Sequence, residues 1–428
     1  MNDLCFLEKL LNGAGFVWIP LEQLGQLVRG NGLPKSDFTE SGIPAIHYGQ
    51  IYTTYRLVTH STMSFVSHET ADSLQKVETG DVIITNTSEN FEDVATPLVY
   101  FGVEQAVTGG HATIFKPNGS ILGMFLAYFM QTPSFEAAKR KYAKGAKVID
   151  VSAKDLAKIG IPIPCPEDPK KSIAIQAEIV RVLDKFTELT AELTAELDGR
   201  KRQYKHYRDK ILTFEGVDVS WKTLDEIGEF IRGRRFTKAD YVDDGISAIH
   251  YGEIYTHYGV YAYETLSKVK SELVDSLRYA EKNDVVIAGV SETVEDVGKA
   301  VAWLGDERVA IHDDSFAFRH TMNPKFIAYA MQTEAFHREK AKHVARGKIK
   351  RLLIDGIKKV RLPIPYADDP EKSLAEQARI VAILDKFDTL TTSLSEGLPR
   401  EIELRNRQYE YYRDLLLSFP KPEEMAEA

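Results

Sequence analysis

One sequence unit of about 200 residues occurs twice in this chain of 428 residues, and this duplication constrains any fold that the chain can adopt. The segment GIPAIHYGQIYTTY at 42–55 returns as GISAIHYGEIYTHY at 245–258, with eleven of fourteen positions identical. A longer segment at 161–190 returns at 362–391, with eighteen of thirty positions identical. Two copies are too few for a solenoid, so we expect two similar domains.

Each copy has two parts. The first is about 150 residues of mixed pattern, with β-rich runs at 81–85 and 284–290 and amphipathic stretches at 126–142 and 327–343. The second is a long helix with apolar side chains at helical spacing. This succession predicts an α+β fold class, in which two similar mixed α/β domains are joined by two long helices.

The first long helix is expected over 172–213 and would be about 60 Å long at 1.5 Å per residue. The second carries four more residues between its matched blocks and also contains Gly397 and Pro399. We therefore expect a kink or restart there, with Pro399 near a new first turn. The stripe expected to form the core of a helix pair is Ile179, Leu183, Phe186 and Leu193 in the first copy and Ile380, Leu384, Phe387 and Leu394 in the second.

A lone amphipathic helix of this length needs a partner, and the other copy is the obvious one. If the two helices pair antiparallel, the two globular domains lie at opposite ends, related by a pseudo-two-fold axis. Two half-sites on duplex DNA have the same symmetry. The helix pair would then set the distance between two readers.

Composition excludes several classes of protein. The apolar share of 43% and the charged share of 27% are ordinary for a globular chain with real cores. No apolar run approaches the roughly 18 residues of a membrane span, and this predicts a cytoplasmic protein without membrane contact. With only Cys5 and Cys165, and with scattered histidines, we expect neither a disulfide scaffold nor a metal site.

A net charge of −9 argues against a generic polycation, but basic residues gather locally. Residues 337–361 hold ten Lys and Arg against two acids, and residues 136–158 hold seven against three. These segments predict contact with a phosphate backbone, and the alternative is an exposed helix face followed by a turn. The basic residues that match in position are Lys139, Arg140, Lys141, Lys144 and Lys147 in the first copy and Arg338, Lys340, Lys342, Arg346, Lys348, Lys350 and Arg351 in the second.

The layout resembles the specificity subunit of type I restriction-modification systems, a family in which two target-recognition domains alternate with two long conserved helices. The matching blocks are LEKLL at 7–11, IPIPCPEDPKKS at 161–172, VLDKF and ILDKF in the two helices, RQYKHYRDKILTF at 202–214 and FPKPEE at 419–424. TAELTAEL at 190–197 resembles the short helical repeat of the type IC subgroup. The resemblance covers nearly the whole chain.

The resemblance implies a first target-recognition domain at 1–165, a central helix at 166–214, a second recognition domain at 215–365, a C-terminal helix at 366–419 and a tail at 420–428. Each domain would read one half of a bipartite double-stranded DNA target. The helix pair would set the spacer and dock two methyltransferase subunits, which methylate one adenine in each half. Restriction subunits then join, and unmethylated DNA is cleaved.

Catalysis is expected on the partner subunits. The sequence contains no NPPF- or DPPY-type adenine methylase motif and no Walker A loop. We therefore expect no catalytic residue and no cofactor on this chain, with S-adenosylmethionine, ATP and Mg bound by the partners. One rival is a self-contained enzyme acting on nucleic acid. The other is a duplicated protein-binding adaptor with a coiled-coil spacer and no DNA recognition.

Candidate base contacts occur at matching positions. Gln50 can bond adenine and Glu253 can accept a hydrogen bond from cytosine. The alternative is a strand element with a glycine bend, which the near-identity of the two copies favours. Asn90 and Glu292 follow strands and either reach bases or cap their loops. The tyrosines near the helix ends are expected to pack or to dock the methyltransferase rather than to stack on DNA: Tyr204, Tyr207, Tyr409, Tyr411 and Tyr412.

Further candidates are expected in loops. His111 and His312 lie at predicted loop tips, and the His312-Asp313-Asp314 run lacks other ligands at useful spacing for a metal. A second basic group occurs in the second copy only, where arginine can read guanine or bind phosphate. Its members are Arg232, Arg234, Arg235 and Lys238, and the alternative is a solvated loop.

The TAEL repeat permits a prediction about the DNA spacer. Four added helical residues advance a helix by about 6 Å and about 40° beyond one turn. One base pair rotates by about 35°. A third TAEL after Leu197 is therefore expected to lengthen the spacer by about one base pair.

Overall fold

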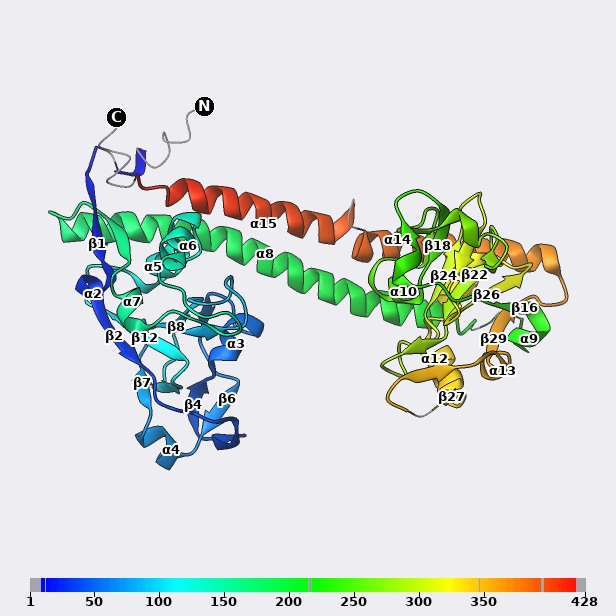
Figure 1. The fold of residues 1–428 in the computed structure, drawn as a ribbon, viewed down its shortest axis with the longest axis horizontal. Coiled ribbons are helices and arrows are strands. Elements are labelled where there is room, and N and C mark those ends of the chain that lie inside the picture. Colours follow the sequence, from blue (N-terminus) through cyan, green and yellow to red (C-terminus); the bar gives the residue numbers. More distant parts are fainter. Residues whose placement is uncertain are drawn as a thin grey trace. The chain divides into compact units, whose positions relative to one another are not determined.

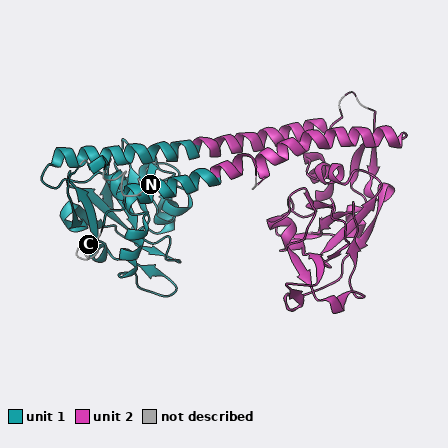
Figure 2. Ribbon diagram, turned by 90° about the horizontal axis from the view of Figure 1, so that it is seen from above, with its two compact units in different colours: residues 1–191, 403–428 teal, residues 192–402 magenta. Residues whose placement is uncertain are grey.

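The computed structural model describes residues 9–11, 13–214, 216, 218–345, 347–393 and 396–420. The chain divides into two compact units, residues 1–191 with 403–428 (unit 1) and residues 192–402 (unit 2), as Figure 2 shows. Both boundaries fall inside long helices. Each unit therefore consists of a globular part and a stretch of each long helix, whereas the sequence analysis separated helices from globular domains.

The globular part of unit 1 is built from short elements (Figure 1). Its strands are β1 (Phe16–Pro20), β2 (Gly25–Arg29), β3 (Phe38–Thr39), β4 (Ile43–Ile46), β5 (Val58–Thr59), β6 (Ser64–Val66), β7 (Gln75–Val77), β8 (Val82–Thr85), β9 (Thr87–Ser88), β10 (Pro97–Tyr100), β11 (Ala106–Thr108), β12 (Ala112–Pro117), β13 (Ile149–Asp150) and β14 (Gly160–Pro164). Its helices are α2 (Leu21–Leu24), η1 (Lys35–Asp37), α3 (Tyr48–Thr53), α4 (His68–Asp72), α5 (Gly123–Phe129), α6 (Pro133–Arg140) and α7 (Ala153–Leu156).

Two mixed sheets organise the described part of unit 1. One five-stranded sheet has the order β2-β12-β8-β10-β5, and the other has the order β3-β6-β4-β11-β7. The pairs β10–β5 and β11–β4 are parallel, and the remaining neighbours are antiparallel. Two short pairs complete the unit, β1 with β14 and β9 with β13.

Unit 2 repeats this plan. Its strands are β15 (Val219–Thr223), β16 (Gly228–Arg232), β17 (Tyr241–Val242), β18 (Ile246–Ile249), β19 (Tyr261–Ala262), β20 (Ser267–Val269), β21 (Tyr279–Ala280), β22 (Val285–Ala288), β23 (Val290–Ser291), β24 (Ala300–Trp303), β25 (Val309–Ile311), β26 (Ser315–His320), β27 (Val344–Ala345), β28 (Lys350–Leu352) and β29 (Arg361–Pro365). Its short helices are α9 (Leu224–Ile227), η2 (Lys238–Asp240), α10 (Tyr251–Thr256), η3 (Ser271–Leu273), α11 (Pro324–Ala330), α12 (Glu334–Ala341) and α13 (Ile354–Ile357). The sheets β16-β26-β22-β24-β19 and β17-β20-β18-β25-β21 match those of unit 1 strand for strand. The duplication in sequence is thus a duplication in structure, and the fold is α+β.

The long helices are α8 (Pro169–Ile211), α14 (Pro370–Thr392) and α15 (Gly397–Leu416). Asp369 caps α14 by accepting a hydrogen bond from Lys372 N, with proline in the first turn. The expected restart is confirmed, because α14 ends at Thr392 and a new helix begins at Gly397. Gly397 has φ +81°, a left-handed conformation that favours glycine.

Two long helices pack in the core of each unit and run in opposite directions there, α8 with α15 in unit 1 and α8 with α14 in unit 2 (Figures 1 and 2). Ile179 and Leu183 are buried in one cluster with Leu416, and Phe186 stacks on Tyr412 at 5.2 Å between ring centroids. In unit 2, Ile380 and Leu384 are buried in one cluster with Tyr204 and Leu212, and Phe387 stacks on Tyr204 at 6.3 Å. Leu193 is half-buried, and Leu394 lies outside the described residues.

The amphipathic stretch 126–142 contains parts of two short helices, because Thr132 caps a new helix whose first residue is Pro133. One local expectation from the sequence is corrected. The HYGQIY element is a helix, α3, and not a strand. His47 caps it by accepting a hydrogen bond from Gly49 N (3.2 Å), which satisfies an end that would otherwise be unpaired. Within the described ranges, none of the helices has both the length and the apolar character needed to cross a bilayer.

Candidate nucleic-acid interface

In unit 1, four chain segments that are distant in sequence meet at one end of the sheets. Arg29 ends β2, and its Nε donates to the carbonyl oxygen of Gly110 (3.1 Å). His111 follows in the same turn, and its Nδ1 lies 2.9 Å from Thr87 Oγ1 of β9. Strand β9 in turn pairs with β13, which follows the basic residues Lys144 and Lys147 in the chain. The fold therefore brings the end of β2, the 109–111 turn and the β9–β13 pair together, and these segments are here called loop cluster 1.

Unit 2 forms the same arrangement, here called loop cluster 2. Arg232 Nε donates to Asp313 O (3.2 Å), as Arg29 does to Gly110. Arg351 of β28 forms an ion pair with Asp314 (3.2 Å). Strand β28 also pairs with β23, so the basic strand, the 312–314 turn and the end of β16 lie together. A small pocket of about 220 Å³ lies among these loops.

A close backbone approach holds each loop cluster together. A Cβ atom on Gly30 would lie 2.1 Å from Gly109 O, and one on Gly233 would lie 2.0 Å from His312 O. Glycine is therefore required directly after β2 and β16, the strands that end in Arg29 and Arg232, because any side chain there would push the loops apart.

Arg29 is a candidate that the sequence analysis missed. It lies 203 residues before Arg232, the offset of the HYG repeats, and it makes the matching hydrogen bond. Aligning every basic residue at that offset would have found it. The arginine at the end of this strand is therefore common to both units.

Aromatic and imidazole rings lie at the centre of each cluster. In unit 1, the rings of Tyr48 and His111 are 4.7 Å apart. In unit 2, the ring of His312 is 4.6 Å from His250 and 5.0 Å from Phe236. His312 lies directly before the 313–314 turn, as expected of a loop residue, but its side chain is buried.

Burial favours the neutral form of the two capping histidines, His47 and His250. Burial lowers the pKa of His47, and the nearby Lys35 and His111 lower it further. Burial and the neighbouring His312 lower the pKa of His250, against a smaller opposing effect of Asp314 and Asp313. Neutral imidazoles offer stacking and hydrogen bonding at these positions rather than charge.

Gln50 and Glu253 hold the ends of short helices. Gln50 donates to Ser64 Oγ (2.7 Å) and accepts from His47 N (3.2 Å). Glu253 accepts from Ser267 Oγ and from His250 N (3.2 Å). Both side chains already have their partners inside the unit, which agrees with the alternative of a fold element.

Asn90 and Glu292 differ in their surroundings. Asn90 donates to Asp93 Oδ2 (2.7 Å) and accepts from Asp93 N (2.8 Å), so it closes its loop in the manner of a cap. Glu292 is exposed, and no hydrogen bond to its side chain is found within the described part of the chain.

The phosphate-contact prediction for Lys139 is corrected. Its side chain is buried, and its Nζ donates to Val94 O (2.9 Å) and Glu92 O (3.2 Å). Lys340 is buried in the same way against Glu295 O and Val297 O. A lysine at this position stabilises the loop whose backbone carbonyls accept its hydrogen bonds. These two carbonyls compensate the cost of burying the ammonium group.

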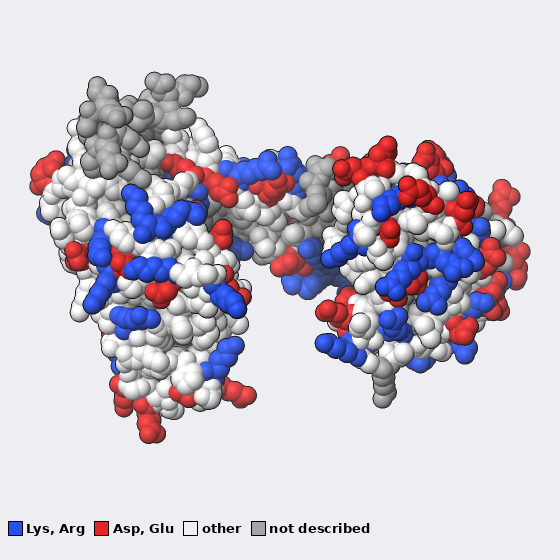
Figure 3. Space-filling view, in the orientation of Figure 1, with Lys and Arg blue, Asp and Glu red and all other residues white. Residues whose placement is uncertain are grey.

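The other basic residues of these segments are on the surface. Arg140 pairs with Glu136 (3.2 Å) and lies over the ring of Phe91, and Lys144 pairs with Asp155 (3.2 Å). The exposed Lys and Arg residues in and beside the two loop clusters are Lys141, Lys147, Arg232, Arg234, Arg235, Lys238, Lys348 and Arg351, with Lys350 half-buried and donating to Gly347 O. Arg338 and Lys342 are also exposed, but they line a different groove of unit 2. Arg346 lies outside the described residues. Figure 3 shows that blue basic side chains gather in places on each unit, with red acidic ones between them.

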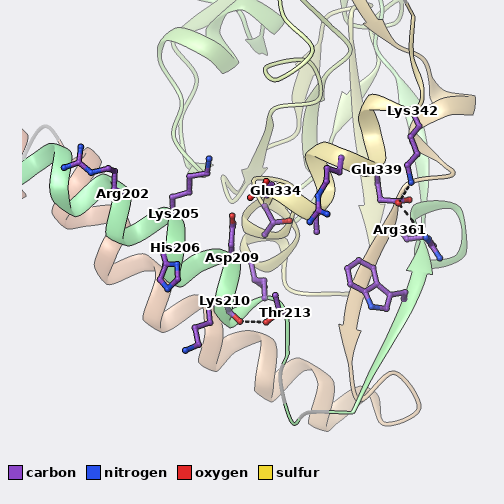
Figure 4. Close-up of a pocket in the computed structure, with 15 residues that line it drawn as sticks. Arg202, Lys205, His206, Asp209, Lys210, Thr213, Glu334, Glu339, Lys342 and Arg361 are labelled. Atoms are coloured by element: carbon purple, nitrogen blue, oxygen red, sulfur yellow. Dashed lines mark hydrogen bonds and ion pairs between the residues drawn. The ribbon is translucent and has the colours of Figure 1, made fainter.

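A separate groove of about 990 Å³ lies in unit 2 between α8, α12 and the β15–β29 pair (Figure 4). The basic residues that line it are Arg202, Lys205, Lys210, Arg338, Lys342 and Arg361. Trp221 also lines it and is 47% exposed. Two of its acids are neutralised locally, because Glu339 pairs with Lys342 and Asp209 pairs with Arg208. The groove therefore offers positive charge beside an exposed indole.

Comparison with known proteins assigns this architecture to a family. The family described as type I restriction modification DNA specificity domain matches residues 16–198 and again residues 217–404, which are the two copies. The EcoR124I/EcoR124II specificity subunit of Escherichia coli is 33% identical over 99% of this chain and 99% of its own length. A putative type I restriction enzyme specificity subunit of Haemophilus influenzae is 28% identical over 98% of this chain and 99% of its own.

A solved structure has a similar fold. It comes from work on complex assembly and conformational transition of the type I restriction-modification system, covers 94% of this chain and 97% of its own, and has a TM-score of 0.61 at 15% identity. The chain belongs to the type I restriction-modification DNA specificity family. Its role in such a system is non-catalytic DNA recognition, and catalysis is carried by partner subunits.

Proposed function

We propose that each unit reads one half of a bipartite DNA target through its loop cluster. The observation that carries this proposal is the repetition of the cluster. The same strands deliver Arg29 and Arg232, and matching turns deliver His111 and His312. Residues that differ between the copies occupy equivalent positions on this common frame, as two different half-sites require.

Within each cluster, charge and base reading divide between residue types. Exposed lysines such as Lys147 and Lys348 contact phosphates, which hold the protein in register without reading sequence. Arg234 and Arg235 follow a glycine that fixes the loop, and a planar guanidinium can bond the guanine edge through two parallel contacts. The net charge of the chain is −9, so electrostatic attraction to DNA is confined to the basic patches. This confinement favours binding of DNA at the loop clusters.

The chemistry belongs to partner chains in this proposal. Two methyltransferase subunits bind the long helices, carry S-adenosylmethionine and methylate one adenine in each half-site, which requires flipping that base out of the duplex. Restriction subunits with ATP and Mg then cleave unmethylated DNA. Because the proposed substrate is DNA inside the cell, we expect the complex to work in the cytoplasm.

The groove beside Trp221 is the proposed docking site for one methyltransferase subunit. Exposed aromatic and arginine side chains are the residue types enriched at the centres of protein interfaces. The surplus of positive charge in this groove fits a partner segment with acidic side chains and an apolar residue for the indole. Trp18, the matching residue of unit 1, instead donates its Nε1–H to Pro420 O (2.8 Å).

Sequencing of methylated adenines in cells that express this chain with its methyltransferase subunit tests the proposal. We expect a bipartite motif with one methylated adenine in each half. Alanine substitution of Arg232, Arg234 and Arg235 should change only the half read by unit 2, and substitution of Arg29 only the other half. An assembled complex that modifies no motif would favour the adaptor alternative.

A Trp221→Ala and Lys205→Glu double variant tests the groove. Co-purification with the methyltransferase subunit is expected to fall to one subunit per chain. A Tyr263→Ala variant is the matched control, because Tyr263 is also an exposed aromatic residue of unit 2 but lies away from the groove. Two bound methyltransferase subunits in the double variant would contradict the docking assignment.

A further inference from the structure

Each globular part is joined to its long helix by the same buried polar contact. In unit 1, Gln176 of α8 accepts from Leu122 N (2.9 Å) and donates to Ser120 O (3.0 Å), where α5 begins. In unit 2, Gln377 of α14 accepts from Asn323 N (2.9 Å), where α11 begins. Both glutamine side chains are fully buried. An amide therefore bridges helix and globular part at equivalent points.

A second contact follows eight residues further along each helix. Tyr128 of α5 donates its hydroxyl to Asp184 (2.6 Å), and Tyr329 of α11 donates to Asp385 (2.8 Å). Burial raises the pKa of both tyrosines well above the usual range. The hydroxyls therefore remain protonated and remain donors. We call each glutamine contact and its tyrosine–aspartate bond together a clamp.

Two anchor points define an orientation that apolar packing alone does not. Eight helical residues separate the anchors by about 12 Å along the axis. Apolar burial is non-directional and tolerates small rotations of one element on another. A fully buried amide and a buried tyrosine hydroxyl bonded to a half-buried aspartate do not, because rotation would leave the buried amide and hydroxyl unpaired.

We propose that these clamps make the spacer length of the DNA target a strict requirement, by fixing each reading domain rigidly on its helix. The inference rests on the proposed function, in which the helix pair sets the distance between two half-site readers. Gln176, Gln377, Tyr128 and Tyr329 are positioning residues that act through the orientation of the loop clusters. None of them belongs to a loop cluster.

The two clamps differ in strength, and this gives a matched comparison. In unit 2, Lys325 also pairs with Asp385 (2.9 Å) and lies over the ring of Tyr261. At the matching position, unit 1 has Met124, which cannot form an ion pair. Loss of the tyrosine hydroxyl should therefore loosen unit 1 more than unit 2.

The test uses the assembled complex of this chain with its methyltransferase subunits. Methylation rates are measured on duplexes that carry the optimal spacer or a spacer one base pair shorter or longer. For Tyr128→Phe combined with Gln176→Leu, the rate on misspaced relative to optimal DNA should rise about threefold to tenfold, the range expected when one or two net hydrogen bonds are lost. Tyr128→Phe alone should give a smaller rise in the same direction, and Tyr329→Phe a smaller one still.

Two controls separate positioning from loss of stability. Ile83→Val removes a buried methyl group from a cluster of unit 1 that does not include α8, and it should lower thermal stability while leaving the spacer preference sharp. Asp184→Asn keeps an acceptor for Tyr128 and should keep most of the preference. An unchanged ratio in Tyr128→Phe and in the double variant, with a sharp bipartite target in the wild type, would overturn this inference alone. A wild-type complex that methylates no bipartite target would overturn the proposed function itself.

Discussion

At the scale of single residues, burial decides which polar side chains are available for DNA. Lys139 and Lys147 lie in the same basic segment, but Lys139 is bonded inside the unit and Lys147 is exposed. Charge counting along the sequence treats the two alike. The two differ because Lys139 lies on the face of α6 that packs against the 88–96 loop, whereas Lys147 lies beyond the end of this helix. Only the tertiary fold defines that packing.

Gln50→Ala is expected to lower the free energy of unfolding of unit 1 by about 1 kcal/mol, because it removes the capping box of α3. The methylated motif should stay unchanged. Gln50→Glu is the matched variant and should restore stability, since Glu253 makes the same contact in unit 2. Thermal melts and motif sequencing check both parts, and a changed base in the motif of Gln50→Ala would instead assign Gln50 to base reading.

A Lys147→Ala and Lys348→Ala double variant should bind all DNA sequences more weakly. Each lost phosphate contact should reduce the slope of log affinity against log salt by about 0.9. Fluorescence anisotropy of the assembled complex over a range of salt concentrations measures this slope. Lys282→Ala, an exposed lysine paired with Asp306 outside both clusters, serves as the control and should leave the slope unchanged.

At the scale of elements, periodicity predicted the long helices well and the short ones poorly. The limits of α8 agree with the expected 172–213 to within a few residues, because its apolar stripe repeats over many turns. Helix α3 has only six residues, and its YGQIYT sequence favours a strand on propensity. Its cap from His47 and its contact with Ser64 decide the outcome, and neither is visible in the local pattern.

A third TAEL inserted after Leu197 should shift the preferred DNA spacer by about one base pair, since four residues add about 40° beyond a full helical turn. Methylation of targets with graded spacers measures the optimum. An AAEL insertion of the same length should give the same shift, because helix length and not the threonine is responsible. An optimum that stays in place with both insertions would exclude the helix as the ruler.

At the scale of the whole molecule, duplication was the strongest prediction, and the two copies share their sheet orders. The loop clusters were predictable only in part. Their basic residues stand out in the sequence, but the meeting of Arg29 with Gly110 depends on a close approach at Gly30 that no local pattern reveals. The division of each long helix between the two units was also not predictable, because helical periodicity does not change at the boundary.

The two units should respond differently to acid. Burial lowers the pKa of His320 to about 4, and its Nε2 has no hydrogen-bond partner among the described residues. In the unfolded chain, His320 is protonated below about pH 6.5, whereas in the folded unit it is protonated only near pH 4. The free energy of unfolding is therefore highest above about pH 6.5 and decreases as the pH falls. The contribution of His320 to this loss should reach about 3 kcal/mol near pH 4, and His337, whose pKa burial also lowers to about 4, adds to the loss for unit 2. Unit 1 has Pro117 at the matching position.

Thermal melts between pH 7 and 4 check this expectation, with tryptophan fluorescence of Trp221 and Trp303 reporting unit 2 and of Trp18 reporting unit 1. A His320→Phe variant should remove about half of the difference in acid sensitivity, because His337 of unit 2 has a similarly lowered pKa. Equal loss of stability in both units of the wild type would contradict it.

The division of the chain into units also has a consequence for the order in which they can mature on the ribosome. Unit 2 is one continuous segment, residues 192–402, whereas unit 1 needs residues from both termini. Leu416, Leu417 and Phe419 complete the core of unit 1, and Phe419 packs against Phe16 at 5.3 Å. The half of the protein that is translated first is therefore the last to close, and a nascent chain that stalls near its end keeps an open apolar surface by which quality control can recognise it.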